Sequence, residues 1–223
     1  MNMRLLKYPA SKWLKHRVLA GDNDLKRHLP DTKLLTGASL LEFVRKYPFI
    51  ILKPVIGGGG HGVIKIAARG ERADVLTAAG RSYRGIRIKG GLVPLIRSLT
   101  RGRHYLVQQG ISLLTIQGRP VDFRVLLLKP GQEWQTMGIM GKWAARNKIV
   151  TNHCRGGRAI VLDKALKLSK SLTDEQCTNI ENQMLRTSKQ MAERMNEYFR
   201  NVRELGLDIA IDQNLQLWLL EAN

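Results

Sequence analysis

The stretch Leu207-Asp-Ile-Ala-Ile-Asp-Gln-Asn-Leu-Gln-Leu-Trp-Leu-Leu-Glu-Ala-Asn223 predicts a β-hairpin. Isoleucines alternate with polar or small residues in its first half, which is typical of a half-buried strand. A two-residue turn at Asn214-Leu215 would pair residues 207–213 with 216–223 in one register. In that register Asp208 faces Glu221, and the other pairs are Ile209 with Leu220, Ala210 with Leu219 and Ile211 with Trp218.

The facing acids suggest a metal site. Directly paired side chains lie about 4.5–5.5 Å apart, where like charges destabilise a sheet. A divalent cation between Asp208 and Glu221 would remove this repulsion, and Asn223 on the same face adds an amide oxygen. Such hard ligands suit Mg²⁺, with phosphate oxygens and water completing its octahedron. A solvent-facing hairpin with acids that bind no metal is the alternative.

A second motif, Ile51-Leu-Lys-Pro-Val-Ile-Gly-Gly-Gly-Gly-His-Gly62, places a glycine-rich loop between two strand-like runs. Glycines let backbone N–H groups approach a phosphate closely, and Lys53 adds a positive charge. The spacing also matches the dinucleotide fingerprint, but that motif opens a helix, whereas here a strand follows. We therefore expect a flexible flap over a triphosphate. A plain glycine-rich hairpin, with His61 as an ordinary loop residue, is the alternative.

Two further motifs carry weaker signals. In Tyr105-Leu-Val-Gln-Gln-Gly-Ile111 a strand breaks at Gly110, where exposed backbone could hydrogen-bond an adenine edge. In Arg119-Pro-Val-Asp-Phe-Arg124 the side chains of Asp122 and Arg124 share one face of a strand. That pair indicates either a functional site or a structural or solvent-exposed salt bridge.

The chain is strongly basic, with 37 lysines and arginines against 18 acids and a formal net charge of +19. A solvated basic face, an extended polyanion and the phosphates of a nucleotide are all compatible with this excess. Aromatic residues are sparse in the basic stretches, so nucleic acid is a disfavoured partner that stays open. Two stretches hold only basic charges: 81–103 has Arg81, Arg84, Arg87, Lys89, Arg97, Arg101 and Arg103, and 142–158 has Lys142, Arg146, Lys148, Arg155 and Arg158.

The length of 223 residues allows one large domain or two packed lobes. No apolar run approaches the roughly 20 residues that span a bilayer, and the start lacks a signal-peptide core. Cys154 and Cys177 form no CxxC pair and no disulfide framework. We expect a cytoplasmic protein without a membrane span.

Apolar periodicity predicts an α+β fold rather than a doubly wound parallel sheet. Thr173 and Gln176 form a predicted capping box for the longest helix, and Gly206 is its predicted C-terminal stop. The predicted helices are 11–28, 38–47, 71–80, 91–100 and 174–205, and the predicted strands before the hairpin are 49–55, 63–67, 105–109, 121–129, 134–141 and 149–152.

Taken in this order, the motifs resemble the ATP-grasp superfamily over nearly the whole chain. The finer pattern is most similar to the spore-coat-associated YheC/YheD type of ATP-grasp protein. The segments that carry this resemblance are Ser11-Lys-Trp13, Leu29-Pro-Asp-Thr32, Gln108-Gln-Gly-Ile111, Val121-Asp-Phe-Arg124, Thr151-Asn152, Gly156-Gly157, Gly206-Leu-Asp-Ile-Ala-Ile-Asp212 and Trp218-Leu-Leu-Glu-Ala-Asn223.

The resemblance implies an ATP-grasp fold, in which two α+β lobes sandwich the nucleotide. It implies a short lead-in over 1–30, a first lobe with the flap over 31–107, and a second lobe with the metal site over 108–223. The residues at the family's functional positions are Lys12, Lys53, Gly58, Gly59, Gly60, His61, Gly62, Gln108, Gln109 and Ile111 for ATP, Asp208, Glu221 and Asn223 for Mg²⁺, and Arg124, Lys142 and Asn152 for the transferring phosphate and the acceptor.

The implied activity is that of an ADP-forming carboxylate–amine ligase working through an acyl-phosphate, on substrates that the sequence does not name. The basic stretches favour an acidic acceptor. Related ligases often carry arginine where Lys142 stands, and lysine keeps the charge but loses the planar fork. Two alternatives remain: a catalytically idle ATP-binding structural protein of the spore coat, and a basic polyanion-binding protein. The resemblance adds spore association to the expected cytoplasmic location.

The resemblance also concerns the two ends of the chain. Only residues 1–30 precede the first lobe, so we expect the usual acceptor-binding N-terminal domain to be nearly absent. Relatives usually continue beyond the position of Asn223, so we expect either a truncated chain or a terminal carboxylate near the metal site.

Overall fold

The computed structural model of this chain describes residues 10–145 and 157–223. Their contacts divide them into two compact units. In the described chain, unit 1 comprises residues 10–29, 111–145 and 157–223, and unit 2 comprises residues 30–110. Each unit is an antiparallel sheet with helices, which confirms the predicted α+β class.

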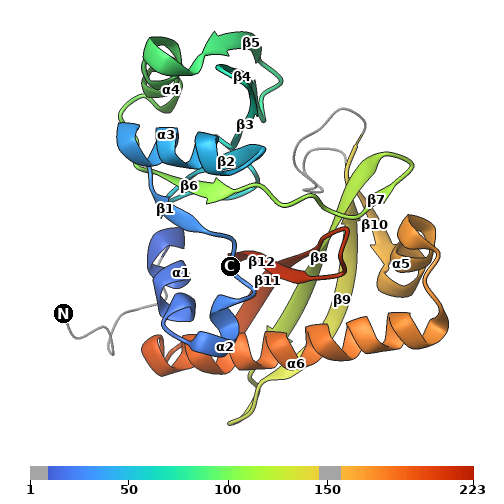
Figure 1. Cartoon of the computed structure of the whole chain (residues 1–223). Helices are drawn as coiled ribbons and strands as arrows, with labels where there is room; N and C mark the ends of the chain where they lie inside the picture. Colours follow the sequence, from blue (N-terminus) through green and yellow to red (C-terminus); the bar gives the residue numbers. More distant parts are fainter. Residues whose placement is uncertain (1–9, 146–156) are drawn as a thin grey trace. The chain divides into compact units, whose positions relative to one another are not determined.

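Unit 2 is built on a six-stranded antiparallel sheet with the order β1-β6-β2-β3-β4-β5 (Figure 1). Its core contains Phe43 of one helix and Ile96 of another together with Ile50 and Ile66 of the sheet, so both helices cover the same face. The elements are β1 (Thr32–Leu34), α3 (Gly37–Lys46), β2 (Phe49–Pro54), β3 (Ile64–Arg69), β4 (Arg72–Thr77), β5 (Ser82–Arg87), a π-helical turn (Ile88–Leu92), α4 (Val93–Thr100) and β6 (Tyr105–Gln109).

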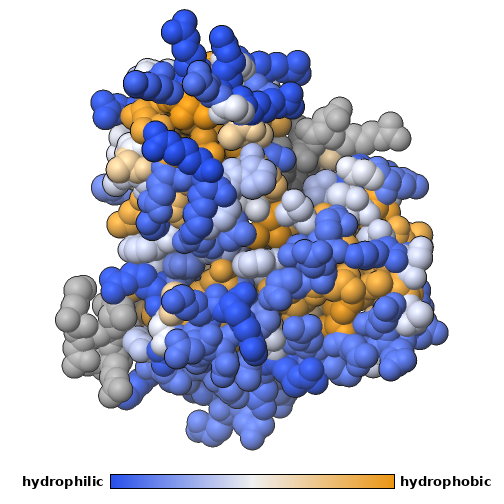
Figure 2. All heavy atoms as spheres, in the orientation of Figure 1, coloured by the Kyte–Doolittle hydropathy of each residue, from blue (hydrophilic) through white to orange (hydrophobic). Residues whose placement is uncertain are grey.

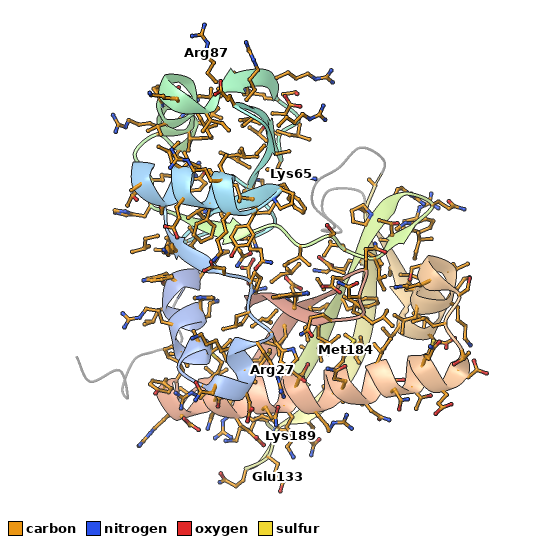
Figure 3. All side chains as sticks on the ribbon, in the orientation of Figure 1. Arg27, Lys65, Arg87, Glu133, Met184 and Lys189 are labelled. Carbon is orange, nitrogen blue, oxygen red and sulfur yellow. The ribbon has the colours of Figure 1, made fainter. Side chains whose placement is uncertain are left out.

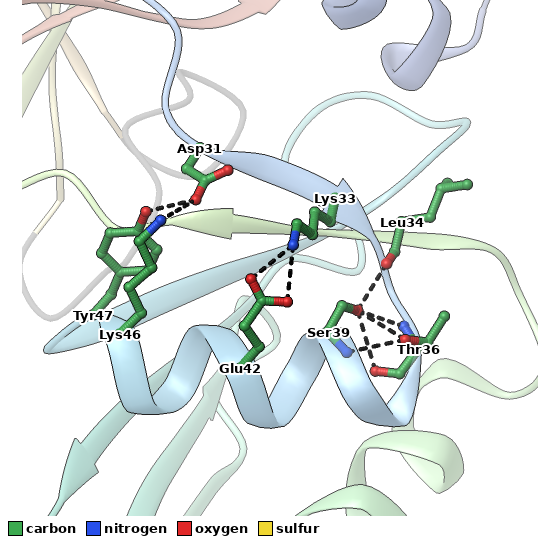
Figure 4. Close-up of polar contacts among 8 residues, drawn as sticks. All are labelled: Asp31, Lys33, Leu34, Thr36, Ser39, Glu42, Lys46 and Tyr47. Carbon is green, nitrogen blue, oxygen red and sulfur yellow. Dashed lines mark hydrogen bonds and ion pairs between the residues drawn. The ribbon is translucent and has the colours of Figure 1, made fainter.

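Polar contacts fix both ends of α3 (Figure 4). At its start, Thr36 Oγ1 accepts a hydrogen bond from the backbone N–H of Ser39, and Ser39 Oγ accepts one from the backbone N–H of Thr36. Near its end, Lys46 Nζ and the Tyr47 hydroxyl both donate to Asp31 Oδ2, at 2.8 and 2.7 Å. Burial would raise the pKa of Asp31, but these two hydrogen bonds hold it below its ordinary value.

Unit 1 is built on a second antiparallel sheet with the order β10-β9-β8-β11-β12, to which β7 adds at β8. The long helix α6 packs along one face, where Met184 is fully buried while Lys189 points away (Figure 3). The elements are α1 (Lys12–Ala20), α2 (Asn23–Lys26), β7 (Thr115–Ile116), β8 (Arg119–Leu128), β9 (Gln135–Trp143), β10 (Arg158–Val161), α5 (Leu162–Lys170), α6 (Asp174–Tyr198), β11 (Glu204–Ile211) and β12 (Leu217–Ala222).

Residues 10–29, part of the short lead-in expected over 1–30, supply two helices to unit 1. Val18 and Leu25 are buried in the same core as Met184 of α6. The helix predicted over 11–28 is interrupted at Gly21. The Asp22 side chain accepts hydrogen bonds from the backbone N–H groups of Asp24 and Leu25 and so starts α2. Contacts also place the passage from unit 2 back to unit 1 after Gly110, whereas the predicted boundary lies after residue 107.

The helix predicted over 71–80 is wrong, because this segment forms β4. Ala73 and Val75 are fully buried, while Arg72, the first residue of the strand, is exposed. A two-residue connection at Gly70-Glu71 folds β4 directly onto β3, and β5 pairs along its other edge. The segment therefore forms a strand, because its alternating side chains fit a half-buried sheet, although several of its residues favour helices. Neither β5 nor α5 was predicted.

The capping box of α6 is confirmed, but its predicted end is not. Thr173 and Gln176 exchange the two expected side-chain-to-backbone hydrogen bonds. The helix ends at Tyr198 instead of residue 205, and Gly206 lies inside β11. Apolar residues continue past the helix end because Phe199 and Val202 enter the same core. The strand predicted over 149–152 lies outside the described residues.

Among the described residues, no helix is both long and apolar enough to cross a membrane.

Candidate functional site

The β11–β12 hairpin places Asp208 directly opposite Glu221, as predicted. The rest of the predicted register is wrong, since Ile209 pairs with Leu219 and Ile211 with Leu217, and Ala210 pairs with Trp218. The connection has three residues between the paired Asp212 and Gln216, with a left-handed residue at its end (Leu215, φ 65°), a common hairpin geometry. The additional residue shifts the register by one.

A β-bulge restores the register at the acidic pair. The pairing shifts between Asp208 and Ile209, so that Leu220 is the extra residue of β12. A bulge places two residues opposite one and bends the strand locally. The longer turn and the bulge cancel, and the one pair on which the metal argument depends is therefore retained.

Basic side chains surround both carboxylates of this pair. Arg124 Nη1 lies 3.0 Å and Lys142 Nζ 2.8 Å from Asp208 Oδ1, and Lys142 Nζ also lies 3.1 Å from Asp122 Oδ1. Lys12 Nζ of α1 lies 3.0 Å from Glu221 Oε1. Asp122 and Arg124, which share a strand face, thus each pair with a residue of a neighbouring element.

These ion pairs change the argument for a metal. Arg124, Lys142 and Lys12 already neutralise Asp208 and Glu221, so cross-strand repulsion by itself does not require a divalent cation. Burial would lower the pKa of Lys142, but the carboxylates of Asp122 and Asp208 outweigh it and raise that pKa above its ordinary value. Lys142 is therefore a fixed positive charge at neutral pH.

The donor atoms nevertheless fit a hard cation. Both ion pairs of Asp208 use Oδ1, and when the Asn223 amide is oriented to satisfy its neighbours, Oδ2 accepts no hydrogen bond from the described residues. In that orientation the Asn223 nitrogen donates to Glu221 Oε1 (2.7 Å) and its oxygen accepts from Arg124 Nη1 (2.9 Å). Asp208 Oδ2 and Glu221 are oxygen ligands of the kind Mg²⁺ prefers. No cluster of three acidic, histidine or cysteine side chains supplements them in the described chain.

Gly206 makes room for the Arg124 side chain. A Cβ atom at Gly206 would lie only 2.3–2.4 Å from the Arg124 guanidinium atoms. The guanidinium therefore crosses β11 directly over Gly206 and reaches Asp208, two residues further along that strand. This residue was predicted as a helix stop, and its role at the site was missed because only the strand pairing reveals it.

Lys15 is a second residue that the sequence interpretation missed. It is buried on α1, three residues after Lys12 and on the same helix face. Burial lowers the pKa of Lys15 to about 8, with Glu221 opposing the shift and Lys12 and Arg124 adding to it. The available signal in the sequence was the spacing of Lys12 and Lys15. They stand three residues apart in a predicted helix, next to apolar residues.

In unit 2 the side chains of Lys53 and Gln108 lie on the sheet face that α3 and α4 leave uncovered. Lys53 is directly paired with Leu106, and Ile51 with Gln108, while the alternating residues Leu52 and Val107 enter the core under the helices. The amide of Gln108 donates to Thr32 Oγ1 at 3.0 Å, so its side chain has a structural role.

Some backbone groups of the predicted adenine hinge already form hydrogen bonds within the protein. The N–H groups of Gln109 and Gly110 donate to the carbonyls of Asp31 and Phe49. An adenine edge would therefore have to use the remaining groups of the hinge, among them the backbone of Ile111. Gly110 is sterically required, since a Cβ there would lie 2.2 Å from the Phe49 ring.

The glycine-rich loop connects β2 to β3, as predicted. Gly58, Gly59 and His61 are exposed, and Gly60 is partly exposed. Gly62 adopts a φ of 74°, and a Cβ there would lie 2.8 Å from both Pro54 and the Tyr105 hydroxyl oxygen. The base of the loop thus needs glycine for both conformation and space. Asn152, predicted near the acceptor, lies outside the described residues.

Comparison with known proteins places these features in a family. A model of YheC/D-like ATP-grasp proteins matches residues 5–223. The chain belongs to the YheC/D-like ATP-grasp family. The resemblance inferred from the motifs is therefore confirmed.

One relative of this ATP-grasp protein is the endospore coat-associated protein YheD of Bacillus subtilis (strain 168), 24% identical over 221 residues. The match covers 96% of this chain but 47% of YheD, so the chain spans about half of that relative.

Solved structures confirm the ATP-grasp fold. D-alanyl-alanine synthetase A from Vibrio cholerae has a TM-score of 0.58 and 13% identity, over 96% of this chain and 54% of that one. L-amino acid ligase from Bacillus licheniformis also has a TM-score of 0.58 and 13% identity, over 96% of this chain and 40% of that one.

Proposed function

We propose that this ATP-grasp protein binds Mg-ATP and acts as an ADP-forming carboxylate–amine ligase. The observation that carries the proposal is the Asp208–Glu221 pair on the hairpin of unit 1, surrounded by Lys12, Arg124 and Lys142. It combines hard oxygen ligands for a cation with cations that can stabilise phosphoryl oxygens.

Unit 2 carries further residues that we propose contact the nucleotide. Lys53 on the uncovered sheet face would neutralise phosphate charge, and the loop Gly58–Gly62 would offer backbone N–H groups to phosphate oxygens. The backbone of Ile111, the first residue of the next segment of unit 1, would contact the adenine edge. Bound Mg²⁺, held by Asp208 and Glu221, would supply charge neutralisation at the phosphates.

The proposed chemistry needs no protein nucleophile. A carboxylate oxygen of the acid substrate attacks the γ-phosphorus, and the bond from phosphorus to the β,γ-bridging oxygen breaks to release ADP. The neutral amine nitrogen then attacks the acyl carbon, and the bond from that carbon to the phosphate oxygen breaks. Inorganic phosphate leaves, and the nitrogen loses a proton to water as the amide forms. Arg124 and Lys142 would stabilise the negative charge on the transferring group, and Asn152 would lie toward the acceptor.

The ion pairs favour one alternative function. Lys142 bridges Asp122 and Asp208, and Lys12 bonds to Glu221, so the cluster is internally neutralised without a ligand. Together with a relative that is endospore coat-associated, this favours a nucleotide-binding protein of the spore coat that does not turn over. A polyanion-binding function of the nucleotide site itself has no comparable support.

The first test is calorimetric titration with ATP, with and without Mg²⁺. We expect wild-type binding to require Mg²⁺ and to weaken about tenfold or more in Glu221→Gln, because a charged ligand oxygen is lost. Glu204→Gln removes the same charge from an exposed position of the same hairpin and should bind like wild type.

The second test separates the two functions. ADP release that requires both a carboxylic acid and an amine would establish the ligase. Mg²⁺-dependent binding of ATP, with no release of ADP in any pool of candidate substrates, would establish a nucleotide-binding protein without catalytic activity. If the wild-type chain binds no ATP, both proposals fail.

A further inference from the structure

A second basic site lies in unit 2, away from the face that carries Lys53. It is a pocket of about 300 Å³ lined by the start of β3, the β4–β5 connection, the end of α4 and the start of β6. Ile64 and Tyr105, which line it, belong to the core under α3 and α4. Lys53 and Gln108 belong to the opposite sheet face. The pocket shares one residue with the proposed nucleotide loop, because Gly62 at the end of that loop also lines it.

Three arginines line this pocket: Arg81, Arg101 and Arg103. All three are exposed, and within the described part of the chain none forms an ion pair with a carboxylate. The segment that contains them, 81–103, has no acid at all. Arg101 caps the C-terminus of α4, but a helix end carries only about half a negative charge and cannot neutralise three guanidinium groups.

Hydroxyl groups complete the polar lining. The Tyr105 hydroxyl accepts a hydrogen bond from Arg103 Nη2 at 3.3 Å, which leaves its own hydrogen available to an anion. Tyr83 and Ser98 also line the pocket. The lining therefore combines three planar, permanently charged forks with neutral donors and contains no acidic side chain.

We propose that this pocket binds the phosphate group of a phosphomonoester or diphosphate. Arginine forks match phosphate and carboxylate oxygens in bidentate geometry. A carboxylate has two oxygens and one charge, whereas a terminal phosphate has three oxygens and nearly two charges, and so can engage all three arginines at once. The volume exceeds that of one phosphate and leaves room for the group that bears it.

The surroundings of the pocket favour the approach of anions. Arg84, Arg87, Lys89 and Arg97 are exposed on β5, the π-helical turn and α4 without lining the pocket. Hydrophilic side chains project around this end of unit 2, and Arg87 points outward from it (Figures 2 and 3). Their summed field would raise the local concentration of anions and their association rate.

The test is titration of the full chain with inorganic pyrophosphate in the absence of Mg²⁺. We expect binding to weaken about tenfold or more in Arg101→Gln and in Arg103→Gln, because each loses charge-assisted hydrogen bonds. Arg87→Gln removes an equal charge from the same end of unit 2 and should stay within about twofold of wild type. Arg101→Gln should bind Mg-ATP like wild type, which separates this pocket from the nucleotide site.

Several outcomes would overturn the proposal. These are no pyrophosphate binding, equal weakening by Arg87→Gln and Arg101→Gln, and citrate binding as tightly as pyrophosphate. Long-chain polyphosphate distinguishes the sources of the phosphate group. If long-chain polyphosphate binds more tightly than pyrophosphate, and Arg87→Gln weakens its binding, the natural ligand is a polymer. Equal affinities for polyphosphate and pyrophosphate would identify a free small molecule.

Discussion

At the scale of single residues, the site depends on Gly206 as much as on the charged residues. Arg124 reaches Asp208 only because its guanidinium passes over a position without a Cβ atom. A methyl group at Gly206 would force the guanidinium away from Asp208 and from the Asn223 oxygen. The backbone of β11 could still form, because the φ of Gly206 is not in the left-handed region.

We therefore predict that Gly206→Ala folds but binds Mg-ATP about tenfold more weakly, because Arg124 no longer holds Asp208. Gly138→Ala is the matched control, since Gly138 also lies in a strand of this sheet and a Cβ there meets no atom within 4 Å. Urea denaturation and calorimetry with Mg-ATP measure the two effects. Equal ATP affinity in Gly206→Ala and wild type would contradict this role of Gly206.

Lys15 gives a second prediction at this scale, for stability against pH. Its pKa of about 8 in the folded protein is below the ordinary 10.5, so the unfolded chain binds more protons between these values. Charged Lys15 therefore destabilises the fold fully below pH 8, and the penalty is relieved as pH rises toward 10.5. Its size is at most about 3.5 kcal/mol, because each pKa unit corresponds to about 1.4 kcal/mol.

The measurement compares urea unfolding of wild type and Lys15→Met from pH 7 to pH 10. The free energy of unfolding of wild type should rise relative to that of the variant across this range. A constant difference would show that burial does not depress the pKa of Lys15.

At the scale of elements, helix ends and strand registers behave differently. The start of α6 was predictable because a capping box is local, and Thr173 and Gln176 are only three residues apart. The register of β11 and β12 combines a longer turn with a distant bulge, and neither has an unambiguous signature in the sequence. Strand pairing also converted the segment 72–77 from a predicted helix to β4.

The α6 cap gives a prediction at this scale. Thr173 is exposed, so Thr173→Ala removes little besides the hydrogen bond to the backbone N–H of Gln176. We expect the free energy of unfolding to fall by about 1 kcal/mol. Thr173→Ser keeps the hydroxyl and should remain within about 0.5 kcal/mol of wild type. Urea denaturation measures both, and an unchanged Thr173→Ala would show that the cap does not stabilise α6.

At the scale of the whole molecule, the positive charges of the two units have different roles. In unit 1, Arg124, Lys142 and Lys12 form ion pairs with carboxylates at 2.8–3.1 Å. In unit 2, the arginines of the pocket pair with no carboxylate of the described chain. The net charge of +19 therefore includes cations with a structural role and cations available to anionic ligands.

The sequence predicted the Asp208–Glu221 pair from a turn that the structure corrects, and the pair is retained because the longer turn and the bulge cancel. By itself the sequence determined the family and the α+β class. These depend on ordered short motifs and on local periodicity, which a linear chain displays. Only the tertiary structure decided that Lys12, Arg124 and Lys142 neutralise this pair, that Gly206 admits Arg124, and that Arg81, Arg101 and Arg103 share a pocket. These contacts join residues far apart in the chain, and their geometry is set by strand register and by the space that neighbouring side chains leave.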